Sequence, residues 1–138
     1  MTPKLYNIKT VRMADASAVK LDFVRKGMCR MSSSATVPWV DLCSVGLSKM
    51  ELSDKIENKV RMYTTKLTCH LLEECQVGNR KLVFLAVTVL GKEFLVGTSD
   101  RPYPIVTQKR MMPDAPSGVS DTEMTVTFTS THPALTVI

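Results

Sequence analysis

Residues 82–90 read LVFLAVTVL, and this stretch decides the fold class. Every residue except Thr88 is apolar, which is typical of a central β-strand that is covered on both of its faces. Gly91-Lys92 interrupts the run and Glu93-Phe94-Leu95-Val96 resumes it, so the pattern predicts a β-hairpin with a tight turn that contains glycine. The cover comes either from the domain's own layers or from another subunit. We expect a chain of this size to need neighbouring copies.

A second strand is predicted at residues 123–129, where the side chains alternate. Met124, Val126 and Phe128 fall on one side, while Glu123 and the threonines fall on the other. A period of two residues predicts a sheet with one face exposed to water. Further strands are expected at 5–13, at 18–24 and at 105–110, the last near a sheet edge.

The segment from Ser48 to Glu74 fits two structures equally well on periodicity. Ile56, Val60, Tyr63, Leu67 and Leu71 have helical spacing. However, the segment contains several β-branched threonines, and its apolar residues from Tyr63 to Leu71 also share one face of a strand. We choose a strand from about 60 to 72, because the neighbouring elements are strands. Residues 26–46 and 111–121 are rich in Gly, Pro and Ser and are expected to be irregular.

The length and composition bound the domain organisation. A chain of 138 residues with 44% hydrophobic and 22% charged residues has the size and composition of one globular domain. We therefore predict a single β domain over residues 1–138, an all-β sandwich or partly open barrel of about six to eight strands.

The positive charge is concentrated at one end of the chain. Residues 1–30 carry seven basic groups and two acidic ones, while the eleven basic and eleven acidic residues of 31–138 cancel. This basic N-terminal region is either a solvated face of a strand or a surface that contacts an anionic partner. One alternative function follows: a small β-barrel that binds nucleic acid through the basic N-terminal region.

The sequence contains no recognisable catalytic or metal-binding motif. The four cysteines have neither a secretory signal before them nor paired zinc spacing, so we expect free thiols, with Cys69, His70 and Cys75 as the one local cluster. His70 and His132 lie outside any catalytic motif, and no phosphate-binding glycine loop is present. We expect a protein that is not an enzyme, with no catalytic residue, metal or cofactor.

Neither a membrane span nor a secretory leader is expected. No window reaches about 18 apolar residues, and the first residues lack an apolar core. We therefore expect no membrane partner.

From Glu57 onward the order of features resembles a family of small virion proteins of phages and prophages from gut Bacteroidetes-type bacteria. The first 56 residues have no counterpart in this pattern. The matching stretches are Val60–Leu67, Asn79–Val83, Gly91–Thr98, Arg101–Pro104, and Gly118–Asp121 before Met124–Phe128.

The resemblance implies a non-enzymatic subunit of the neck, head-to-tail connector or tail, assembled as a homo-oligomeric ring. Its location would be the virion, after synthesis in the bacterial cytoplasm. Its partners would be copies of itself, other neck or tail proteins, and packaged DNA. Contacts are expected from residues 26–46, from 111–121 and from the terminal segments. The candidate interaction residues are Lys4, Lys9, Arg12, Trp39, Arg101 and Tyr103, with Trp39 also expected as a packing anchor.

Overall fold

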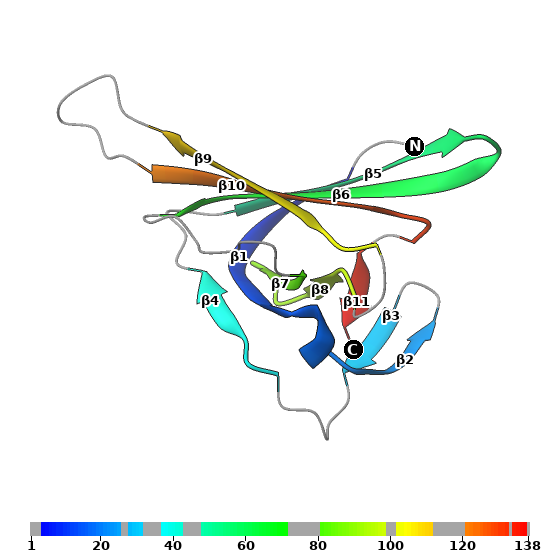
Figure 1. Ribbon diagram of the computed structural model, residues 1–138, viewed down its shortest axis with the longest axis horizontal. Coiled ribbons are helices and arrows are strands. Elements are labelled where there is room, and N and C mark those ends of the chain that lie inside the picture. Colours follow the sequence, from blue (N-terminus) through cyan, green and yellow to red (C-terminus); the bar gives the residue numbers. More distant parts are fainter. Residues whose placement is uncertain are drawn as a thin grey trace.

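The computed structural model describes residues 4–25, 28–31, 37–42, 48–71, 81–98, 102–111, 121–132 and 134–137. Within these ranges the chain forms eleven β-strands, one short 3₁₀ turn and no α-helix, which confirms the all-β class. The strands join into one sheet that does not close on itself, as expected for a sandwich or a partly open barrel (Figure 1).

The strands are β1 (Lys4–Asp15), β2 (Leu21–Arg25), β3 (Met28–Met31), β4 (Val40–Leu42), β5 (Ser48–Glu57), β6 (Val60–Leu71), β7 (Leu82–Thr88), β8 (Glu93–Val96), β9 (Ile105–Met111), β10 (Asp121–Ser130) and β11 (Leu135–Val137). The expected count of six to eight was too low. Three of the extra strands, β3, β4 and β11, have only three or four residues, too few for a periodic pattern to stand out.

The order of the strands divides the sheet into two halves. The path runs β2-β3-β11-β8-β7-β1-β5-β6-β10-β9, and β4 pairs with β1 beside this path. Strands β5, β6, β10 and β9 form one layer, shown across the top of Figure 1, and β7, β8, β11, β3 and β2 lie below it. The two layers enclose the main hydrophobic core.

Strand β1 belongs to both halves. Its residues Lys4–Ile8 pair with β5, and from Ile8 to Asp15 it pairs with β7. The register with β7 shifts between Ile8 and Thr10, which marks a β-bulge. A bulge bends a strand and increases its twist, so β1 can leave one layer and enter the other.

The ambiguous segment is a β-hairpin made of β5 and β6, which confirms the strand predicted at 60–72. The two strands pair from Lys49↔Thr68 to Glu57↔Val60. Asn58 and Lys59 form the turn and both have positive φ angles, 51° and 65°. Positive φ at both central residues is the requirement of a type I′ hairpin turn. Because Lys stands where Gly is usual, the sequence did not reveal this turn.

The larger core cluster lies between the two layers. Its biggest fully buried members are Phe84, Phe128, Ile8, Met50 and Leu67. Met124, Val126 and Phe128 all point into it, as their alternation predicted. This cluster covers one face of β7.

A smaller cluster covers the other face of β7. It contains Val83 together with Leu95, Leu135 and Cys29, and the 3₁₀ turn (Ala16–Ala18) contributes Ala16. All five residues from Leu82 to Ala86 are buried within a single copy. The expectation that β7 needs cover from neighbouring copies was therefore wrong, because the chain supplies a second, smaller core from its own short strands and connecting segments.

Candidate functional site

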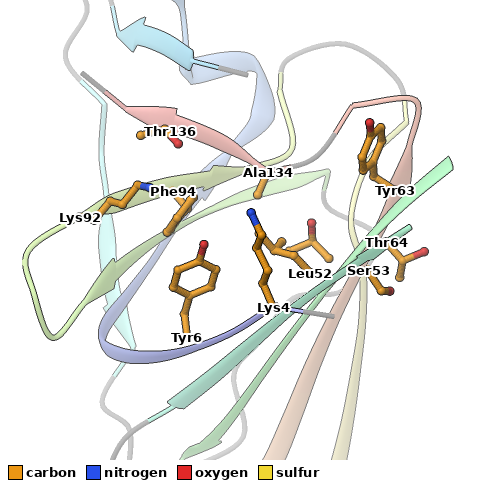
Figure 2. Close-up of a pocket in the computed structure, with 11 residues that line it drawn as sticks. Lys4, Tyr6, Leu52, Ser53, Tyr63, Thr64, Lys92, Phe94, Ala134 and Thr136 are labelled. Atoms are coloured by element: carbon orange, nitrogen blue, oxygen red, sulfur yellow. The ribbon is translucent and has the colours of Figure 1, made fainter. Parts of the chain in front are cut away.

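A pocket of about 280 Å³ opens where the two layers separate near the start of β1. Its walls come from β1, β5 and β6 on one side and from β8, β11 and the residues beside them on the other (Figure 2). The lining residues are Lys4, Tyr6, Leu52, Ser53, Tyr63, Thr64, Thr65, Lys92, Phe94, Ala134 and Thr136.

Strand alternation places the aromatic and basic groups of the pocket together. Lys4 and Tyr6 are two residues apart on β1, so they share a face, and the same holds for Lys92 and Phe94 at the start of β8. The rings of Tyr6 and Phe94 are 5.0 Å apart between centroids at 52°, a tilted aromatic contact between the two walls. The Lys92 ammonium lies 5.0 Å from the centre of the Phe94 ring.

The pocket has an excess of positive charge. Two lysines line it and no carboxylate does. By alternation from Leu52, the nearest acidic side chain on the same face of β5 is Asp54, and Arg61 Nη1 donates to its Oδ2 at 2.6 Å. No ion pair joins Lys4 or Lys92 to a carboxylate within the described ranges. The charge of the two ammonium groups is therefore free to attract an anion.

One hydroxyl in the pocket lining is buried without a partner. Thr65 is 1% exposed, and its Oγ1 makes no hydrogen bond. A buried polar atom without a partner is destabilising by about 1–3 kcal/mol. Such a group is expected where a ligand completes the hydrogen bonding.

The basic residues highlighted by the sequence do not form one surface. Lys4 lines the pocket, while Lys9 is exposed beyond it at the bulge of β1. Arg12 Nε donates to Asp41 Oδ1 on β4 at 2.7 Å. The N-terminal charge is thus distributed over separate places, and part of it is neutralised.

The other candidate residues mostly serve packing. Trp39 and Tyr103 are half-buried against the smaller core cluster, which confirms the packing role expected for Trp39. Lys81 Nζ lies 5.2 Å from the centre of the Tyr103 ring. Arg101 lies outside the described residues, as do residues 32–36 and 43–47 of the expected loop at 26–46 and residues 112–120 of the second loop.

Sequence reasoning missed most of the pocket lining, including Lys92, Tyr63 and Thr65. Lys92 lies in a predicted turn, and Tyr63 is one position of a predicted apolar stripe. No local motif could reveal them, because Lys4 and Lys92 line the same pocket only through the pairing of β1 with β7 and of β7 with β8.

Two strands at the ends of the sheet have a free edge in the part of the chain that the structure describes. β9 pairs only with β10, and β2 pairs only with β3. On β9, the exposed residues Ile105, Thr107 and Lys109 alternate with half-buried ones, and Ile105 is 66% exposed. Unpaired edges are the usual templates for pairing with another chain.

The described cysteines are free thiols. Cys29 and Cys69 are both buried, while Cys43 and Cys75 lie outside the described residues. Burial raises the pKa of Cys29 to about 11, so its thiol is protonated and unreactive at neutral pH. Among the described residues, no group of three His, Cys, Asp or Glu side chains is placed to hold a metal ion. The same residues include no helix with the length and apolarity to cross a bilayer.

Comparison of this chain with protein-family models, curated proteins and solved structures gives no match. The pocket and the free edges are therefore the structural features that bear on function.

Proposed function

We propose that this chain is a non-enzymatic virion subunit that assembles with copies of itself into a closed ring at the neck, head-to-tail connector or tail of a phage. The observation that carries the proposal is the open sheet, which ends in two free strands of different sequence, β9 and β2. The resemblance of residues 57–128 to small phage virion proteins supports the same function.

The two free edges allow a head-to-tail contact between copies as well as a two-fold one. β9 has seven residues and β2 has five, so β9 of one copy can pair along the whole length of β2 in the next. A contact between two different edges is heterologous, and repeating it generates a ring when the rotation closes. Each new ladder would satisfy backbone N–H and C=O groups that the monomer exposes to water.

Assembly in this proposal takes place at the edges of the sheet, not over the face of β7. Residues Leu82 to Ala86 are buried by their own chain, so this part of the apolar run supplies no reason for association. Each free edge strand also carries an exposed apolar side chain, Ile105 on β9 and Val24 on β2. The proposal therefore predicts that disruption of β9 abolishes assembly, while the fold of the subunit survives.

The test is the assembly state of the purified protein. Light scattering after size-exclusion chromatography gives the molar mass, and electron microscopy shows whether the particles are rings. We expect rings for the wild-type chain and monomers for the double variant Ile105→Lys/Thr107→Lys, because lysines on an edge oppose strand pairing. The matched control is Val89→Lys/Leu90→Lys, which places the same charge in the exposed β7–β8 turn and should leave the rings intact.

Two results would contradict the proposal. One is a wild-type protein that stays monomeric at micromolar concentration and is absent from purified phage particles analysed by mass spectrometry. The other is a ring that forms equally well with and without the two edge lysines, since assembly would then use another surface.

A further inference from the structure

The pocket between the layers has the features of a ligand site that the assembly proposal does not use. Its volume of about 280 Å³ lies just below the range for small-molecule sites, which starts near 300 Å³. It combines two lysines, three aromatic rings and several hydroxyls in one concave surface. Apolar walls with a few convergent polar groups are typical of such sites.

We propose that this pocket binds a nucleoside monophosphate unit, that is, a phosphate joined through a sugar to a flat base. The ammonium groups of Lys4 and Lys92 bind the phosphate, since both line the pocket and neither is paired with a carboxylate in the described ranges. Figure 2 shows the Lys4 side chain extending into the space between the two walls. Phosphate contacts with charged donors are short, strong hydrogen bonds.

The aromatic side chains provide the surface for the base. Phe94 is buried as the floor, whereas Tyr6 and Tyr63 are half-buried, so parts of their rings and hydroxyls remain accessible. Stacking of a base on an aromatic ring is worth about 1–3 kcal/mol by alanine substitution and tolerates any base.

Thr65 provides the independent sign that a polar ligand belongs here. Its buried Oγ1 has no hydrogen-bond partner among the residues that the structure describes, and Thr65 is one of the residues that line the pocket. A ligand oxygen can accept a hydrogen bond from this hydroxyl. Replacing the threonine with valine should therefore weaken ligand binding, while the free protein should keep its stability or gain some.

The experiment measures binding by isothermal titration calorimetry with four probes: dTMP, thymidine, inorganic phosphate and the single strand (dT)12. We expect dTMP to bind more tightly than thymidine or phosphate, because each of these lacks half of the contacts. Lys4→Ala and Lys92→Ala should each weaken dTMP binding about 10-fold, and Thr65→Val should weaken it several-fold. Both lysines are exposed, so their removal should not unfold the chain.

The matched controls are Lys49→Ala and Lys66→Ala. These lysines lie on β5 and β6 around a separate shallow groove with Leu5, Glu51 and Thr68. Each control variant removes one positive charge, as the pocket variants do, and should leave the dTMP affinity unchanged. This result would distinguish binding in the pocket from non-specific electrostatic attraction.

Comparison of dTMP with (dT)12 shows whether the ligand is a free nucleotide or part of a single-stranded nucleic acid. Binding of (dT)12 that is lost in the same lysine variants identifies the unit as part of a single-stranded nucleic acid. Binding of dTMP without (dT)12 identifies a free nucleotide. The inference would be overturned if neither dTMP nor (dT)12 bound. It would also be overturned if dTMP bound equally well to the pocket variants and the control variants. The ring proposal is tested by molar mass, so either proposal can fail alone.

Discussion

The two faces of β7 bury similar apolar side chains but are covered in different ways. On one face, Phe84 packs in the large cluster built from the long strands β1, β5, β6 and β10. On the other face, Val83 packs under short strands, the 3₁₀ turn and the half-buried Trp39 and Tyr103. A central strand can thus be covered by regular structure on one side and by connecting segments on the other, and a small chain needs no neighbour for this.

The first prediction tests whether the two hydrophobic clusters that cover the faces of β7 differ in rigidity. Leu67 and Leu95 are both fully buried, one in each cluster. We expect Leu67→Ala to lower the free energy of unfolding by about 4 kcal/mol, and Leu95→Ala to lower it by about 2 kcal/mol, because connecting segments can move into a cavity more easily than paired strands. Urea denaturation measures both values. Equal losses would indicate that the smaller cluster is packed as rigidly as the larger one.

The second prediction concerns Gly97, which follows β8 and lies under the segment that leads into β9. Its φ is +93°, and a Cβ added there would lie 2.8 Å from Pro104 Cδ and 3.3 Å from Val83 Cγ1. Gly97→Ala should therefore cost about 2–3 kcal/mol of stability through backbone strain and a clash with a stiff ring.

Gly91→Ala is the control for that substitution. Gly91 has nearly the same φ, +91°, but no atom lies within 4 Å of the added Cβ. Gly91→Ala should lower the free energy of unfolding by only about 1 kcal/mol. Thermal or urea denaturation measures both glycine variants. Similar losses at the two positions would mean that the contact with Pro104 contributes nothing.

The third prediction uses Cys29 to probe the smaller cluster. Its pKa is raised from 9.0 to about 11 in the folded chain, so between these values the unfolded chain loses the thiol proton while the folded chain keeps it. Stability is therefore unaffected below pH 9 and falls as the pH rises toward 11. From the two pKa values the loss is about 2 kcal/mol at pH 10.5.

The measurement is the difference in unfolding free energy between the wild type and Cys29→Ala as a function of pH. The difference should be constant below pH 9 and shift in favour of the variant above it. A flat difference up to pH 10.5 would show that the thiol ionises normally, and hence that the cover over this face admits water.

The smallest effect is expected outside both clusters, at the ion pair between Arg12 and Asp41. Their side chains are 42% and 67% exposed, and exposed pairs contribute only about 0.2–1 kcal/mol. Arg12→Ala, Asp41→Ala and the double variant form a cycle that isolates the pair energy. A coupling well above 1 kcal/mol would mean that β4 depends on this contact for its place beside β1.

The sequence predicted those elements whose side chains follow a simple period. Residues 123–129 alternate over their whole length, and 82–96 combine an apolar run with a turn that contains glycine, so β10 and the β7–β8 hairpin were found. β5 was missed, because its alternation covers only residues 48–52 and its polar second half leads into a turn without glycine.

The pocket and the second cover of β7 could not be predicted from the sequence. The pocket joins Lys4 to Lys92, and the cover joins Val83 to Ala16, Cys29 and Leu135. Each set becomes adjacent only through pairing between distant strands. The nucleic-acid alternative stays a prediction.

The path of β1 through both halves of the sheet has a consequence for the order of folding. During synthesis β1 can pair with β4 and β5 once about half of the chain has emerged, but its other edge must wait for residues 82–88. Contacts between residues so far apart in the chain slow folding, because a large loop must close before they form. The nascent chain therefore exposes an unpaired edge of β1 until residues 82–88 have emerged, and a chaperone or another nascent copy can reach this edge in the meantime.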